Sequence, residues 1–81
     1  MASMDETYRA RYQTLGLKIA YYRKKKGLTQ EQFAEALEIS WSFVSQIEAN
    51  NGKKLRGVSL QTLFRMADFF EIPVTKLLEE D

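Results

Sequence analysis

The amino-acid sequence predicts an all-α fold, with five helices in one small domain. Apolar residues recur at intervals of three and four along most of the chain, which is the spacing of one face of an α-helix. Residues that cap helices stand before these apolar runs, and Gly, Asn or Pro stands after them. No alternating run and no hairpin signal indicates a β-strand. The length of 81 residues allows one domain.

The composition excludes several kinds of chemistry. The chain has neither His nor Cys, so it has no thiol nucleophile, disulfide, zinc finger or imidazole base. We therefore expect no metal, no cofactor and no enzyme activity. Catalysis by carboxylates, Lys or Tyr stays open as an alternative, although no cleft-forming architecture is indicated. The start of the chain has no targeting signal and the longest apolar run, Ile19–Tyr22, is too short to cross a bilayer, so we expect a cytoplasmic protein without a membrane partner.

Charge is unevenly distributed along the chain. Residues 1–58 hold ten Lys and Arg against six Asp and Glu, whereas residues 59–81 hold two against five. Basic residues cluster at 23–26 and at 53–56, and the chain ends on the acidic residues 79–81. Such clusters are often solvated helix ends and loops, and the first also suits the negative end of a helix dipole. The alternative is that they contact phosphates.

The first helix is predicted from Asp5, which can cap it, to Gly27, which ends it. Its apolar stripe comprises Tyr8, Tyr12, Leu15, Ile19 and Tyr22. Thr29 begins a second helix, and Gln32 completes a capping box with it. This helix reaches about Leu37. The inward side chains are Phe33, Ala34 and Leu37.

Ser40 caps a third predicted helix, which runs to about Ala49 with Val44 and Ile47 inward. Residues 50–52, Asn-Asn-Gly, are typical of a segment that ends a helix. Ser59 then caps a fourth helix, and the pair Ile72-Pro73 stops it. Its expected inner stripe is Leu60, Leu63, Phe64, Ala67 and Phe70. A short last helix, Val74–Glu79, follows Pro73.

Residues 30–49 have the pattern of a helix-turn-helix, two short helices joined by a tight turn. Ala34 supplies the small residue that the helix crossing needs. Ser42, Ser45 and Gln46 supply a polar outer face to the second of these helices. Any small helical bundle would explain the apolar spacing, but not the two caps and the short turn together.

The segments GLTQEQFAEAL (27–37) and ISWSFVSQIE (39–48) resemble the phage repressor/Cro-like (XRE-type) helix-turn-helix family, and IPVTKLL (72–78) resembles its closing helix. The resemblance implies a five-helix, lambda-repressor-like domain over residues 15–78. Residues 1–14 would be an extension that continues into the first helix, and residues 79–81 an acidic tail. It also implies a bacterial or phage transcription regulator, usually a repressor, that binds palindromic double-stranded DNA as a homodimer.

The resemblance also implies roles for individual residues. The third helix would lie in the major groove and read bases, with the residues Trp41, Ser42, Ser45 and Gln46. Phosphates would be bound by Gln30, Ser40, Lys53, Lys54 and Arg56. Arg23 and Glu48 would form a structural ion pair. No Lys or Arg lies between Trp41 and Ala49, so this helix cannot make the common Arg–guanine contact, whereas Gln46 suits adenine.

Two residues leave alternatives open, and a third departs from the family pattern. The ring of Trp41 could cover thymine methyl groups or lie against the backbone with its N–H on a phosphate; it could instead fold onto Lys or Arg stems or join a protein contact. Phe43 could wedge between the two helices or meet DNA. Glu38 stands where the family usually has a Gly in the left-handed conformation. That conformation costs a non-Gly residue about 1–2 kcal/mol.

The last two helices are rich in large apolar residues, and a self-complementary surface is one interpretation. The expected dimer interface comprises Phe69, Val74, Leu77 and Leu78; the alternative is that all of them are intramolecular. Other functions also stay open. The chain could be an antitoxin or protein-interaction module that binds its own operator, or the DNA-binding piece of a longer protein. No small-molecule ligand is indicated.

Overall fold

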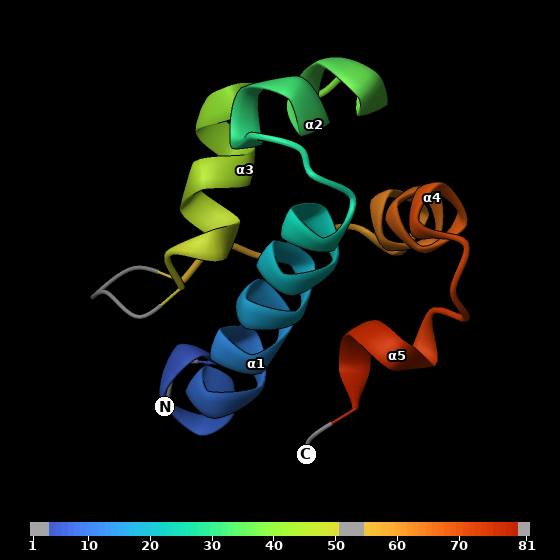
Figure 1. Cartoon of the computed structure of the whole chain (residues 1–81). Coiled ribbons are helices and arrows are strands. Elements are labelled where there is room, and N and C mark those ends of the chain that lie inside the picture. The colour runs from blue at the N-terminus through green and yellow to red at the C-terminus, as the bar shows by residue number, and fades with distance from the viewer. Residues whose placement is uncertain (1–3, 51–54, 80–81) are drawn as a thin grey trace.

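Five helices form the fold in the part of the chain that the structure describes, as the sequence predicts. The computed structural model describes residues 4–50 and 55–79, with side chains from residue 8 onward. The helices are α1 (Met4–Lys25), α2 (Gln30–Leu37), α3 (Trp41–Glu48), α4 (Leu60–Phe70) and α5 (Thr75–Leu78), and this part of the chain contains no strand. α1 lies between α3 on one side and α4 and α5 on the other (Figure 1). None of the helices described is both long and apolar enough to cross a membrane.

The starts of α2, α3 and α4 are fixed by the predicted caps. Thr29 Oγ1 accepts a hydrogen bond from the Gln32 amide at 3.1 Å, and Gln32 Oε1 accepts one from the Thr29 amide at 2.9 Å, which completes the capping box. Ser40 Oγ accepts from the Phe43 amide at 3.0 Å, and Ser59 Oγ accepts from the Thr62 amide at 3.1 Å. Each cap satisfies an amide that the helix itself leaves unpaired.

Two helices end on glutamates in the left-handed conformation. Glu38 has φ 57° after α2, as the comparison with a family Gly predicts, and Glu71 has φ 60° after α4, which the sequence did not indicate. In both turns the next amide reaches back into the helix: Ile39 N donates to Ala34 O and Ile72 N donates to Ala67 O, each at 3.0 Å. These bonds satisfy carbonyl groups at the helix ends.

The core is formed by side chains from all five helices. Its buried members are Leu15, Ile19, Phe33, Ala34, Leu37, Val44, Ile47, Leu63, Met66, Ala67, Phe70 and Leu77. The Phe33 and Phe70 rings stack with centroids 5.2 Å apart, and Phe69 packs against Phe33 at 5.7 Å. This aromatic cluster joins α2 to α4.

The expected inner stripe of α4 is wrong for two residues. Leu60 is 66% exposed and Phe64 is 50% exposed, whereas Met66 is wholly buried. The buried stripe is formed by Leu63, Met66, Ala67 and Phe70. This stripe is centred nearer to Met66 than the spacing alone suggests, so Leu60 and Phe64 lie beyond its edge.

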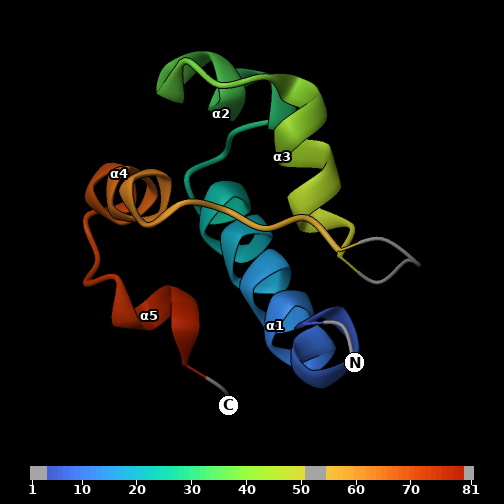
Figure 2. The same cartoon turned by 180° about the vertical axis from the view of Figure 1, so that it is seen from behind.

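Gly16 lets α1 and α3 approach backbone to backbone. A Cβ atom on Gly16 would stand 2.3 Å from the carbonyl oxygen of Ile47. The chain then leaves α3, and residues 55–59 cross α1 on the way to α4 (Figure 2). α3 is therefore held against α1 along its inner face, and its outer face is left to solvent.

Candidate nucleic-acid interface

The outer face of α3 collects the residues expected to read bases. α2 and α3 have eight residues each and pack together across the turn that contains Glu38. Val44 and Ile47 are buried beneath α3. The residues on its exposed face are Trp41, Ser42, Ser45 and Gln46. The structure therefore places the four candidates on one accessible surface at the second helix of the motif.

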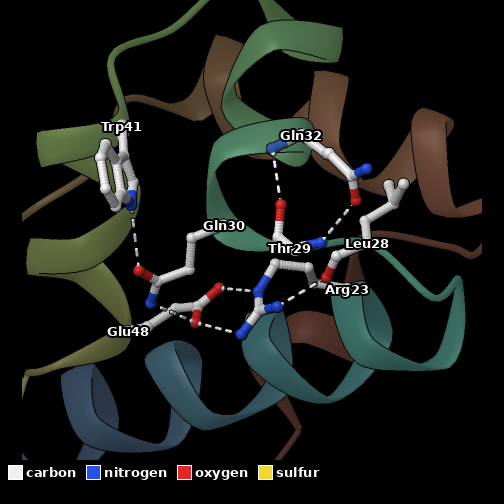
Figure 3. Close-up of polar contacts among 7 residues, drawn as sticks. All are labelled: Arg23, Leu28, Thr29, Gln30, Gln32, Trp41 and Glu48. Carbon is white, nitrogen blue, oxygen red and sulfur yellow. Dashed lines mark hydrogen bonds and ion pairs between the residues drawn. The ribbon is translucent and has the colours of Figure 1, made fainter.

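Arg23 and Glu48 form a two-pronged ion pair between α1 and α3. Arg23 Nε donates to Glu48 Oε2 at 2.7 Å, and Nη2 donates to Oε1 at 2.9 Å (Figure 3). The third arm, Nη1, donates to the Leu28 carbonyl at 2.7 Å. Both side chains are more than nine-tenths covered. The pair is thus a structural link that fixes the end of α3 on α1, the role that the family resemblance implies.

Gln30 extends this network from Glu48 to Trp41. Its Nε2 donates to Glu48 Oε1 at 3.0 Å, and its Oε1 accepts from Trp41 Nε1 at 3.3 Å (Figure 3). The role of Gln30 as a phosphate anchor stays a prediction, and one N–H and the oxygen of its amide are engaged within the protein. Of the alternatives for Trp41, the structure shows neither a Lys nor an Arg stem bonded to its indole N–H, which donates to the amide oxygen of Gln30.

Three further polar side chains at α3 form hydrogen bonds within or at the start of the helix. Gln46 Nε2 donates to Ser42 Oγ at 3.2 Å, one helical turn away. Ser40 Oγ accepts a hydrogen bond from the Phe43 amide and so caps α3. Its binding to phosphate stays a prediction. Phe43 is half-buried and packs against the core, in line with the wedge interpretation.

Asn50 has a role that the sequence analysis missed. It reads as a loop residue, yet it is 2% exposed. Its Nδ2 donates to the carbonyls of Tyr12 at 3.4 Å and Arg56 at 3.1 Å, and its Oδ1 accepts from the Arg56 amide at 2.7 Å. Asn50 therefore joins the end of α3 to α1 and to the segment that returns toward α4. Only its long-range partners distinguish it from an ordinary turn Asn.

The structure describes part of the loop that carries the second basic cluster, residues 53–56. Arg56 is exposed, and its guanidinium carbon lies 4.8 Å from the centroid of the Phe43 ring. This places a cation beside α3, held by the Asn50 contacts to its own backbone. Lys53 and Lys54, the other two residues expected to bind phosphates, lie outside the described residues.

The expected dimer interface needs correction. Leu77 is wholly buried in the core, so it cannot contact a second copy of the chain. Phe69 and Val74 are half-buried and pack on the same core, with Lys26 over the Phe69 ring at 5.3 Å. Of the four residues, only Leu78 is largely exposed, at 53%. The short helix α5 closes one side of the core, and Leu77 is the side chain that it buries there.

Comparison with known proteins agrees with this architecture. The helix-turn-helix family model matches residues 19–77, from the last third of α1 into α5. The propionyl-CoA carboxylase regulator of Cereibacter sphaeroides is 40% identical over 62 residues, which are 76% of this chain and 13% of that protein. The chain thus spans a small part of the relative's length. On these grounds the chain belongs to the helix-turn-helix family of DNA-binding transcriptional regulators.

Proposed function

We propose that the chain is a sequence-specific repressor that binds a palindromic operator as a homodimer, with α3 in the major groove. The observation that carries this proposal is the exposed face of α3, where Trp41, Ser42, Ser45 and Gln46 stand on a helix locked to α1. A rigid helix with polar side chains facing outward can present them to base edges in a reproducible register. The name of the relative supports a regulatory role.

The chemistry of this face favours A·T base pairs. Gln46 can make two hydrogen bonds to adenine N6 and N7, worth about 1–3 kcal/mol of discrimination. The serines can donate or accept and so orient the helix more than they select a base. The absence of Lys and Arg from α3 removes the contact that most often selects guanine.

Affinity would come from phosphate contacts outside α3. Lys53, Lys54 and Arg56 follow α3 in the chain, and each cation that neutralises a phosphate releases counterions. Arg56 already lies beside α3 against Phe43. The hydroxyl of Ser40 and the N-terminal end of α3, where a helix leaves amides without partners of its own, would add contacts.

Dimerisation would place two copies of α3 about one DNA turn apart, ~34 Å. With Leu77 assigned to the core, three large apolar side chains are exposed on the last two helices: Leu60, Phe64 and Leu78. We propose that the dimer surface draws on these residues. The mass of one chain, from which light scattering would distinguish the dimer, is 9.4 kDa.

Selection of bound duplexes from a random pool tests the proposal. We expect an inverted repeat whose half-sites are one helical turn apart, and light scattering of the complex should show two chains per duplex. Failure to bind any duplex at about 50 mM salt would contradict the proposal, since electrostatic attraction is strong there. A single unrepeated site bound by one chain would contradict the dimer alone.

A further inference from the structure

Trp41 stands at the end of a hydrogen-bond network whose direction is fixed. The Arg23 guanidinium occupies both oxygens of Glu48, which as a carboxylate can only accept. The Gln30 amide must then turn its nitrogen to Glu48, and this leaves its oxygen toward Trp41. The ion pair between α1 and α3 therefore determines which group the indole meets.

This arrangement uses the one polar group of the indole. A tryptophan side chain has a single N–H donor and no acceptor, and here the donor is bonded to Gln30 Oε1 at 3.3 Å. The side chain is nevertheless 56% exposed. What Trp41 presents to a partner is therefore an apolar ring, held at its nitrogen edge by Gln30 (Figure 3).

A DNA duplex offers a specific match for such a surface. Contact with a phosphate would call for a donor, and the indole donor is already bonded. The apolar feature of base edges in the major groove is the C5-methyl group of thymine. Trp41 is the first residue of α3, and the N-terminal residues of a recognition helix are those that contact base edges.

We propose that Trp41 reads the C5-methyl group of a thymine in each half-site of the operator, with Gln30 as the residue that positions its ring. This inference rests on the proposed function and names the base feature that the site selects. Gln46, one turn and a half further along α3, would read an adjacent adenine, so both contacts select A·T pairs.

Replacing thymine by deoxyuridine tests the inference, because it removes the methyl group and nothing else. The probe is a labelled duplex recovered from the random pool, with each thymine of a half-site replaced in turn. For the native chain we expect a loss of about fourfold in affinity per half-site at one position, the size of one buried methyl group. With Trp41→Ala the same replacement should have no effect at that position.

Two further variants make the test specific. Gln46→Ala should lower the affinity and keep the ratio between thymine and deoxyuridine at the Trp41 position. Trp41→Phe retains a ring but loses the N–H that Gln30 holds, so it should keep a thymine preference smaller than that of the native chain; a phosphate-donor role would make it as weak as Trp41→Ala. Circular dichroism of each variant checks that the exposed substitution leaves the helices intact.

The outcomes are distinct. Absence of binding to any duplex overturns the proposed function itself. Binding that is insensitive to deoxyuridine, or a bound site without thymine, overturns the role of Trp41. So does a methyl dependence that persists in Trp41→Ala, because another residue then reads the methyl group. A dependence lost with Trp41→Ala and kept with Gln46→Ala supports the inference.

Discussion

Gly16 of α1 lies so close to α3 that a Cβ atom on it would stand 2.3 Å from the carbonyl oxygen of Ile47. The neighbour is backbone, so it cannot turn aside as a flexible side chain can. The proposed recognition helix is thus seated directly on α1, and the Arg23–Glu48 pair fixes the end of the same contact. The position of α3 depends on both features.

Gly16→Ala should therefore destabilise the fold. We expect a loss of about 1–3 kcal/mol in the free energy of unfolding, the usual cost of forcing extra volume into a packed contact. Gly57→Ala is the matched control, because a Cβ there meets nothing within 4 Å. Urea unfolding followed by circular dichroism gives both values. Equal stability of the two variants would contradict the close approach.

Glu48→Gln should lower the free energy of unfolding more than the same change in an exposed ion pair. The change leaves the buried Arg23 guanidinium without its counter-charge, so we expect a loss of about 3 kcal/mol in unfolding free energy. Glu79→Gln makes the same chemical change in the Lys76–Glu79 pair, which is half exposed and 3.7 Å long. That variant should change stability by about 0.5 kcal/mol or less. Similar losses in both would show that the Arg23–Glu48 pair is not buried in solution.

Glu38→Gly should stabilise the chain. Glu38 has φ 57°, a conformation that costs a residue with a Cβ atom about 1 kcal/mol relative to Gly. Glu35→Gly is the control with the opposite sign, because Glu35 lies within α2, where Gly costs about 1 kcal/mol. Thermal unfolding should show a higher Tm for the first variant and a lower Tm for the second. A fall in Tm for Glu38→Gly would mean that its side chain contributes more than its backbone costs.

Asn50→Ala should loosen the junction after α3. The substitution removes three hydrogen bonds and leaves the Arg56 amide without its partner, so we expect a loss of about 2–3 kcal/mol. Gln61→Ala, at an exposed position of α4, should be close to neutral. Denaturant midpoints of the two variants measure the difference. A neutral Asn50→Ala would show that these bonds are replaced by water at no cost.

The parts of the fold that the sequence predicted are those set by near neighbours. Thr29, Ser40 and Ser59 cap helices through amides three residues away, so the pattern is visible in the sequence. The pairing of Arg23 with Glu48 joins residues 25 positions apart, and its expectation came from the family resemblance and not from spacing.

The missed features depend on how helices meet. Nothing local distinguishes Gly16, which matters only because the Ile47 backbone lies against it. Leu60 and Phe64 have the spacing of core residues, but the rotation of α4 on the core favours Met66. The engagement of Gln30 by Glu48 and Trp41 also requires α2 and α3 to be packed together.

The central claim is that the outer face of α3 reads sequence, and the ratio of two affinities tests it most directly. The affinity for the selected duplex is divided by that for a shuffled duplex of equal length at one salt concentration, for the native chain and for Gln46→Ala. We predict that the variant lowers this ratio by about tenfold or more and binds the shuffled duplex as the native chain does. An unchanged ratio, or equal losses on both duplexes, would contradict the claim.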